Sequence, residues 1–277
     1  MKVVVLGSGP AGATLYRLLK GKPNTQVDIF GRRETTACGL ESCAWGVNRL
    51  KFQELCNRLD LVSERYYTNH CKYFHFWKFR IPCDIVMIDK ALFLQDLIGA
   101  SILYGQPEVS KYDRVIDATG LTNGKSYTTF QVKAKGKLPL RVSISLLPSL
   151  HYLWYFPLSD NTTHIGIMSF TDNLGRLKDK MDRYEPICQC YSKIHNQGLV
   201  ETLVEGNVWK AGESAGVVDP ITGSGVLSSM ASALLLYENW DDPEGYKKAM
   251  SNKFGYMSSR PRALFHNEFR GIPIRLG

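Results

Sequence analysis

The sequence predicts an α/β protein: a Rossmann-type nucleotide-binding domain with an inserted antiparallel β-rich domain. Its first residues read as an apolar strand at Lys2–Leu6, the glycine-rich turn Gly7–Gly12 and a helix overlapping that turn at Ala11–Lys20. A second strand at Thr25–Phe30 completes the opening of a Rossmann unit. Another glycine-rich block occupies Gly212–Gly225, and alternating aromatic segments typical of antiparallel strands lie between the two blocks.

Composition restricts the class of protein. The chain has 277 residues, of which 44% are apolar and 22% charged, as in ordinary globular proteins. The apolar start Val3–Leu6 is too short for a signal peptide, and no run reaches the roughly 18 apolar residues of a membrane span. Seven cysteines without a secretory signal indicate a reducing compartment. We therefore expect a cytoplasmic protein.

The elements of the first half follow from periodicity and end signals. Leu50–Leu61 is amphipathic and predicts a helix, whereas Tyr66–Val86 is aromatic and alternating and predicts strands outside the nucleotide domain. Asp89 is a typical N-cap for a helix that runs to about Ser101. Tyr112–Ala118 reads as a buried strand, which ends in the small residues of the run Asp117–Gly120.

The second half is read in the same way. Antiparallel strands of a second sheet are expected at Thr128–Ile144, His151–Phe156 and Thr163–Phe170, because these segments are rich in aromatic and β-branched residues. The strand Val208–Ala211 leads into the second glycine block. Expected helices are Leu174–Tyr184, Cys188–Leu203, the almost wholly apolar Val226–Trp240, and Pro243–Tyr256.

The two glycine blocks predict how a ligand is held. Gly7, Gly9 and Gly12 would form the turn, admit a pyrophosphate and pack the helix on the sheet, respectively. In the second block, Gly223–Gly225 opens the helix that starts at Val226 and directs its dipole at an anionic group. Together they predict one dinucleotide gripped at both ends, with the pyrophosphate at the first block and the ribityl chain and flavin ring at the second.

These motifs resemble the para-hydroxybenzoate-hydroxylase-like FAD-dependent oxidoreductase superfamily. The narrower resemblance is to its geranylgeranyl reductase family, and it rests on Tyr152-x-Trp154-x-Phe156-Pro157 followed by Gly166. The pair Cys38-Gly39 and the helix start Asp89-Lys90-x-x-Phe93 are similar to that family as well. The resemblance implies an FAD-dependent reductase of carbon–carbon double bonds in an isoprenoid or related apolar lipid.

The resemblance also assigns domains and site residues. It implies an FAD-binding domain of residues 1–65, 88–122 and 205–245, a substrate domain of 66–87 and 123–204, and a basic C-terminal helix and tail at 246–277. Catalytic residues would be Cys38 and Tyr152, and substrate-binding residues Tyr152, Trp154 and Phe156. The expected FAD contacts are Gly7, Gly9, Pro10, Ala11, Gly12, Arg32, Arg33, Cys38, Gly39, Lys90, Ala118, Thr119, Gly120, Gly212, Glu213, Pro220, Gly223, Ser224, Gly225 and Val226.

Among the departures from the family pattern, two concern the cofactor. The carboxylate that normally ends the second Rossmann strand and binds the adenosine ribose is replaced by Gly31, with Arg32 and Arg33 after it. We expect Arg32 or Lys90 to organise the adenosine end instead. The family's Gly-Asp becomes Gly212-Glu213, whose longer side chain can still accept a hydrogen bond from a ribityl hydroxyl.

Other readings stay open. The same fold and cofactor would serve an FAD-dependent monooxygenase, and a minimal flavin- or lipid-binding protein without turnover is a third reading. Because no second nucleotide fingerprint is present, electrons would come from NAD(P)H visiting the flavin or from a carrier protein such as ferredoxin. Cys188-x-Cys190 with His195 offers only three ligands, so no metal is expected.

Charge bears on partners. The net charge is +8, and the residues from Gly245 onward carry seven Lys or Arg against the single acid Glu268. Such a tail can meet an anionic membrane surface, which would make the protein peripheral to a membrane, or only solvent. We do not expect the protein to bind nucleic acid, because the positive charge is the one feature of the sequence that would favour such binding.

Overall fold

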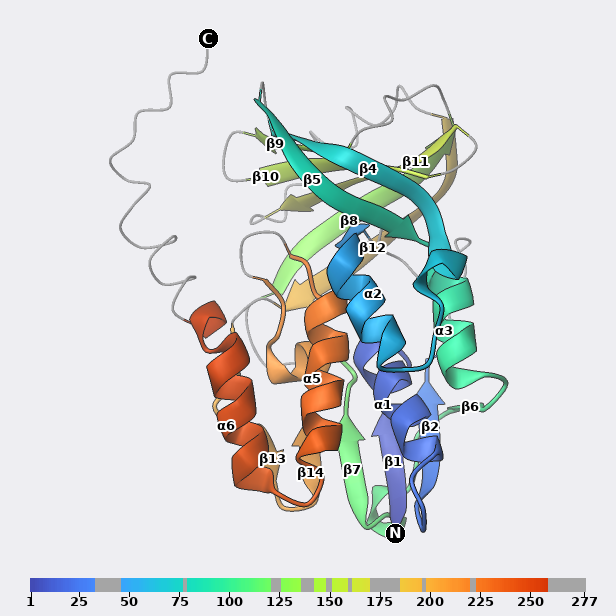
Figure 1. Cartoon of the computed structure of the whole chain (residues 1–277), viewed down its shortest axis with the longest axis vertical. Helices are drawn as coiled ribbons and strands as arrows, with labels where there is room; N and C mark the ends of the chain where they lie inside the picture. Colours follow the sequence, from blue (N-terminus) through green and yellow to red (C-terminus); the bar gives the residue numbers. More distant parts are fainter. Residues whose placement is uncertain are drawn as a thin grey trace. The chain divides into compact units, whose positions relative to one another are not determined.

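The computed structural model describes residues 1–32, 46–76, 79–120, 126–135, 142–147, 151–158, 161–169, 185–195, 198–219 and 223–258. The chain forms two compact units (Figure 1). Unit 1 comprises Met1–Gly31, Ser101–Lys125 and His195–Gly277, and unit 2 comprises Arg32–Ala100 and Ser126–Ile194. Unit 2 thus includes residues 32–65 and 88–100, which the resemblance assigns to the FAD-binding domain.

Unit 1 contains a six-stranded sheet whose inner pairs are parallel. Across the sheet the strands are β13 (Val204–Glu205), β14 (Val208–Lys210), β7 (Arg114–Asp117), β1 (Lys2–Leu6), β2 (Gln26–Gly31) and β6 (Ile102–Tyr104). Val3, Val4 and Val5 are completely buried, as expected of a central strand covered on both faces. The predicted β-α-β opening of the chain is therefore confirmed.

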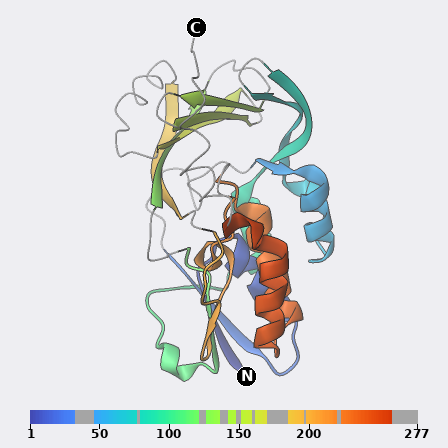
Figure 2. The same ribbon diagram turned by 90° about the vertical axis from the view of Figure 1, so that its left-hand side faces the viewer.

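The helices in the described part of this unit are α1 (Pro10–Lys20), α5 (Val226–Glu238) and α6 (Pro243–Phe254). Helix α5 packs against both α1 and α6, and Figure 1 and Figure 2 show α6 beside it. Single 3-10 turns occur at η2 (Val109–Lys111) and η3 (Gly212–Ala215). The contact between α1 and α5 matters for function, because each helix begins at one of the two glycine blocks.

The described residues of unit 2 form an eight-stranded sheet and the helices α2 (Arg49–Asn57) and α3 (Lys90–Ile98). The strand order of the sheet is β12 (Glu185–His195), β8 (Ser126–Lys135), β11 (Thr162–Ser169), β10 (His151–Pro157), β9 (Val142–Leu147), β4 (Tyr67–Phe76), β5 (Phe79–Ile88) and β3 (Gly46–Asn48). The 3-10 turn η1 (Ser63–Tyr66) leads into β4. Asp89 caps α3 as predicted, because its Oδ1 accepts a hydrogen bond from the Leu92 N–H at 3.0 Å.

One predicted helix is wrong. The segment Cys188–Leu203 was expected to be helical, but Glu185–His195 forms strand β12 at the end of the sheet, next to β8. Cys188 and Cys190 are buried while Ile187, Gln189 and Tyr191 between and beside them are exposed, and this alternation has the period of a strand. The expected stretch Thr128–Ile144 is two strands, β8 and β9, and the expected helix Leu174–Tyr184 lies outside the described residues.

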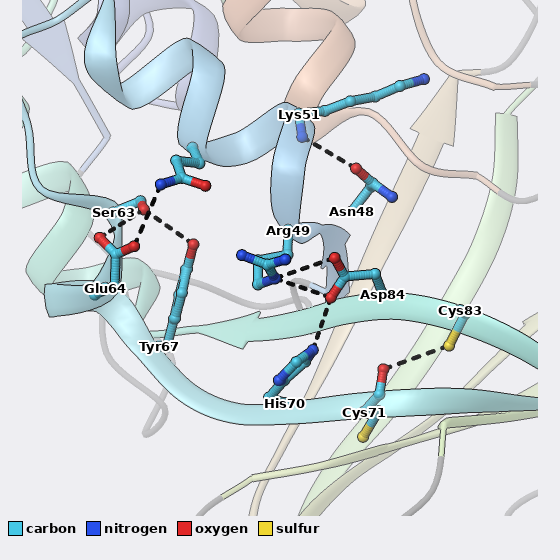
Figure 3. A network of polar contacts seen from close by, with 11 residues as sticks. Asn48, Arg49, Lys51, Ser63, Glu64, Tyr67, His70, Cys71, Cys83 and Asp84 are labelled. Atoms are coloured by element: carbon cyan, nitrogen blue, oxygen red, sulfur yellow. Dashed lines mark hydrogen bonds and ion pairs between the residues drawn. The ribbon is translucent and has the colours of Figure 1, made fainter.

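A polar network joins the start of α2 to the β4–β5 hairpin (Figure 3). The Arg49 Nε–H lies 2.9 and 3.0 Å from the two carboxylate oxygens of Asp84, and the His70 Nε2 lies 2.7 Å from Asp84 Oδ1. The hydrogen bond from Arg49 lowers the pKa of Asp84 below its ordinary value. At the same helix end, the Asn48 side chain accepts from the Lys51 N–H and caps α2.

The base of unit 1 is held by a stacked arginine. The Arg114 guanidinium lies 4.5 Å from the ring centre of Trp209 and 4.2 Å from that of Trp240, and it donates to the Trp240 carbonyl. Tyr246 stacks on Trp209 at 5.7 Å. This cluster ties the start of β7 to the connection between α5 and α6.

Replacing Arg114 with lysine should lower the free energy of unfolding by about 2 kcal/mol, because an ammonium group cannot stack its plane on two rings. Urea unfolding followed by fluorescence would measure the loss. Arg65→Lys is the control, since Arg65 makes an exposed ion pair with Asp96 and should change stability by less than about 1 kcal/mol. Equal losses in the two variants would contradict the structural role of the stack.

Candidate functional site

The first glycine turn is closely packed at Gly7 and Gly12 and open at Gly9. A Cβ at Gly7, whose φ is +108°, would lie 2.2 Å from the Ala118 carbonyl oxygen. A Cβ at Gly12 would lie 1.9 Å from the Gly7 carbonyl oxygen, whereas one at Gly9 would have no described atom within 4 Å. Gly7 and Gly12 therefore let the turn close and the helix pack, and Gly9 leaves room for a ligand beside the backbone.

The helix that follows this turn presents unpaired donors. Gly9 is the N-cap of α1, and within the described structure no side chain caps the helix. Pro10 occupies the first turn, which contains no acidic residue. The free N–H groups and the positive end of the helix dipole therefore favour an anion at this end, as the pyrophosphate of a dinucleotide requires.

The second glycine block lies against the first. A Cβ at Gly212, whose φ is +67°, would be 2.6 Å from the Ala11 Cβ, so only glycine allows η3 to approach α1 this closely. The Gly212 N–H donates to Ser232 Oγ on α5 at 2.8 Å, which fixes the turn to the helix. Two motifs separated by most of the chain thus meet within unit 1.

The second block ends in another uncapped helix. Gly225 is the N-cap of α5, and the part of the chain that the structure describes offers it no side-chain cap. Asp219 shapes the loop before it: its N–H donates to the Ser224 carbonyl and its own carbonyl accepts from the Gly223 N–H, each at 2.9 Å. Pro220, another expected FAD contact, lies outside the described residues.

A polar network closes the end of β7 next to these turns. Asp117 Oδ1 accepts from the Thr119 N–H at 3.1 Å, from Thr119 Oγ1 at 2.7 Å and from Ser214 Oγ at 3.0 Å. Ser214 Oγ in turn accepts from the Gly120 N–H at 2.9 Å. The network holds the expected contacts Ala118, Thr119 and Gly120 beside the second block. Ser214 was not among the predicted site residues, although it lies inside the block that identified them.

Glu213 projects into the same region. Its Oε1 accepts from the His195 N–H at 2.7 Å, and its Oε2 would be 3.4 Å from a Cβ on Gly120. Burial raises the pKa of Glu213 to about 7, and the hydrogen bond from His195 opposes that rise only in part. Near neutral pH the carboxyl group can therefore be protonated or ionised. The protonated form can donate a hydrogen bond to a hydroxyl group, and the ionised form can accept one.

Glu213 should make stability depend on pH. Because its pKa is raised on folding, the folded protein keeps this proton to a higher pH than the unfolded chain, so stability falls as the pH rises from the ordinary carboxyl range to about 7. Glu213→Gln cannot ionise and should gain about 2 kcal/mol over the parent at about pH 8 but not at about pH 4. Urea unfolding at both pH values tests this, with the exposed Glu205→Gln as control. A parallel pH dependence of parent and Glu213→Gln would contradict it.

The adenosine end of the site departs from the usual pattern, as the sequence indicates. Gly31 ends β2, and a Cβ there would be 2.7 Å from Ser8 Oγ in the first turn. Asp28, the acidic residue of that strand, accepts a hydrogen bond from the Tyr112 hydroxyl at 2.9 Å. Arg32 is exposed just after the strand, and Arg33 lies outside the described residues. The role of Arg32 in binding adenosine stays a prediction.

In unit 2, the predicted substrate residues lie on strand β10. Trp154 is buried and covers Gly166 of β11, where a Cβ would lie 2.0 Å from the indole ring. Phe156 packs against Cys71 and Met87. Leu153 faces the opposite side with Phe130, Val132, Ala134, Ile165 and Ile167. The side chain of Tyr152 and the residues Cys38 and Gly39 lie outside the part that the structure describes, so their roles stay predictions.

Two basic groups, one of them a predicted FAD contact, lie in the same unit. Lys90 is buried at the start of α3, with 8% of its surface exposed. His164 lies opposite Phe156 in β11, and its Nδ1 has no hydrogen-bond partner among the described residues. Burial, followed by the charges of Lys90 and Lys133, lowers the pKa of His164 to about 3. His164 is therefore a neutral imidazole at neutral pH.

The cysteine motif lies on strand β12, where Cys188 takes part in a disulfide, contrary to the reduced cysteines expected from the sequence, and Cys190 is a free thiol. Cys188 and Cys190 share one face of β12, and the Gln131 Nε2–H donates to Cys190 Sγ at 3.3 Å. Over the described ranges, no three His, Cys, Asp or Glu side chains gather closely enough to bind a metal ion. Likewise, no helix in these ranges is long and apolar enough to span a bilayer.

Comparison with known proteins identifies the fold. No family profile matches the chain. An uncharacterised protein of Methanocaldococcus jannaschii is 20% identical over 95% of this chain and 91% of its own length. A geranylgeranyl bacteriochlorophyll reductase-like protein from Thermoplasma acidophilum superposes with a TM-score of 0.74 at 16% identity, covering 94% of this chain and 85% of that one.

Other solved structures share this fold. Klebsiella pneumoniae HpxO, solved with FAD and uric acid, gives a TM-score of 0.65 at 13% identity over 95% of this chain and 86% of its own. A tryptophan 6-halogenase from Streptomyces toxytricini gives 0.68 at 14% identity over 91% and 75%. The chain therefore shares the α/β fold of these proteins, in which a Rossmann-type sheet is combined with a separate, largely antiparallel sheet.

Proposed function

We propose that this protein is an FAD-dependent oxidoreductase that reduces carbon–carbon double bonds of an isoprenoid or related apolar lipid. The observation that carries the proposal is the contact between the two glycine blocks, at Gly212 and Ala11, which lets one extended dinucleotide reach both uncapped helices. The similarity of fold to an FAD complex and to a geranylgeranyl reductase-like protein supports it.

The residues of unit 1 suit FAD in their chemistry. The open space at Gly9 and the free N–H groups at the start of α1 would hold the pyrophosphate. Glu213 would hydrogen-bond the ribityl chain, and the start of α5 would stabilise negative charge on the flavin ring. When bound and reduced, FAD supplies a hydride. We also propose that NAD(P)H or an electron-carrier protein such as ferredoxin reduces the FAD.

The protein's own contribution to the reaction is binding and proton supply. Trp154 and Phe156 would orient an apolar chain through aromatic contact. Saturating a double bond requires a hydride at one carbon and a proton at the other, so an acid must face the second carbon. By the family resemblance, the Tyr152 Oη or the Cys38 Sγ would supply that proton.

An anaerobic turnover assay tests this reaction. Protein reduced with dithionite and mixed with a geranylgeranyl lipid should reoxidise its flavin and yield a product with fewer double bonds. Tyr152→Phe and Cys38→Ser should separate the proton donor from a residue that only shapes the site. If neither reoxidation nor a saturated product is seen, the proposed reaction is wrong.

A monooxygenase is the second candidate, since the similar structures include a probable FAD-dependent monooxygenase from Pseudomonas aeruginosa. It predicts substrate-stimulated oxidation of NAD(P)H in air, with oxygen from O₂ appearing in the product. A flavin-binding protein without turnover would instead show neither reaction while still retaining FAD.

A further inference from the structure

The β4–β5 hairpin of unit 2 carries exposed side chains towards its tip, where Phe74–Phe76 of β4 also pair with β9. Figure 1 shows the two strands as a long twisted pair. Towards the tip, Phe74 pairs with Ile81, His75 with Arg80 and Phe76 with Phe79. Paired residues of antiparallel strands share a face, so the tip has one face lined by Phe74, Ile81 and Phe79 and another carrying Arg80.

The apolar face continues from the core into solvent. Phe74 packs on the cluster around Cys71 and Met87. Further out, Ile81 is 46% exposed and Phe79 is 65% exposed. Large apolar side chains that adjoin on an exposed face are typical of a surface that contacts another body.

The opposite face is cationic and aromatic. The Arg80 guanidinium lies 3.5 Å from the centre of the Tyr73 ring, and Tyr73 is 41% exposed. The sequence from Tyr67 to Cys83 contains Lys72, Lys78 and Arg80 but no Asp or Glu. The stretch from Tyr67 to Cys83 therefore combines exposed apolar and aromatic groups with positive charge.

We propose that the tip of this hairpin docks on an anionic lipid bilayer. Aromatic rings and basic side chains around a small apolar surface are the combination that favours the interface between headgroups and acyl chains. A second copy of the chain is a poorer occupant, because it would bring Lys72 and Arg80 against identical charges. The evidence for this docking surface comes from the hairpin residues and does not depend on the proposed reaction. If that reaction is correct, docking on a bilayer would give the enzyme access to a lipid substrate.

Sedimentation of the full-length protein with vesicles tests the proposal. We expect binding to phosphatidylcholine vesicles that contain phosphatidylserine, weaker binding without phosphatidylserine, and weakening by salt. The double variant Phe79→Ser/Ile81→Ser should bind at least about tenfold more weakly. Arg80→Gln should bind about fivefold more weakly, because each basic residue near such a surface contributes a comparable factor.

Matched controls separate this surface from general effects. Val62→Ser removes an apolar group that is 68% exposed outside the hairpin, and Lys51→Gln removes an exposed positive charge. Both should bind like the parent, and circular dichroism should show that all variants are folded. The proposal is overturned if the parent does not bind, or if the Phe79→Ser/Ile81→Ser variant binds as the parent does because the basic residues after Gly245 suffice. It is also overturned if the hairpin mediates only self-association in sedimentation velocity. The vesicle experiment measures binding and not turnover. A failure of the proposed reaction would therefore appear in the turnover assay and not in this experiment.

Discussion

Replacing Gly9 with glutamate is expected to weaken FAD binding by about 100-fold or more while leaving the fold intact. Gly9 has a φ of −71°, and a Cβ added there would have no described atom within 4 Å, so the protein can accommodate the side chain. The new carboxylate would stand where the pyrophosphate binds, and juxtaposed like charges cost several kcal/mol. Titration with FAD, followed by quenching of flavin fluorescence, measures the affinity.

The control for this variant is Gly21→Glu. Gly21 is the C-cap at the other end of α1, with a φ of −89° and its nearest neighbouring atom 3.8 Å from a Cβ. The same change of charge should leave FAD binding near that of the parent, with only a small loss of stability at the negative end of the helix. If Gly9→Glu binds FAD as well as Gly21→Glu does, the pyrophosphate does not lie at this turn.

The second large effect is expected at Gly12. Gly12→Ala would place a methyl group 1.9 Å from the Gly7 carbonyl oxygen and 3.2 Å from Val5 Cγ1. These neighbours are backbone and a buried strand side chain, so relief requires the turn to shift. We expect the free energy of unfolding to fall by about 3 kcal/mol or more, together with loss of FAD binding.

Gly9→Ala is the matched comparison, because it adds the same methyl group three residues earlier in open space. Its midpoint of urea denaturation should equal that of the parent within error, whereas that of Gly12→Ala should fall clearly. Equal midpoints for the two variants would show that α1 does not pack on the turn as closely as described.

Much of the fold can be predicted from local sequence, because its strongest signals are local. The run from Lys2 to Gly31 contains its own strand, turn and helix signals, and the Asp89 cap acts within four residues. Strand β12 could not be predicted in this way. Its alternation is short and its partner β8 lies far away in the sequence, so tertiary pairing decided its conformation.

The same distinction applies to the site. The glycines of both blocks could be identified because their spacing follows from the backbone geometry that each turn requires. The sequence could not show that Asp28 pairs with Tyr112, that Ser214 bridges Asp117 and Gly120, or that Glu213 accepts from the His195 backbone. Each of these contacts joins segments brought together only by folding.

The most direct test of the central claim is an FAD titration of the purified full-length protein, followed by visible absorption. An extended FAD held at both glycine blocks predicts saturation at one FAD per chain, with a shifted and structured flavin spectrum caused by the surroundings of the bound ring. A colourless protein whose addition leaves the spectrum of free FAD unchanged would contradict the account.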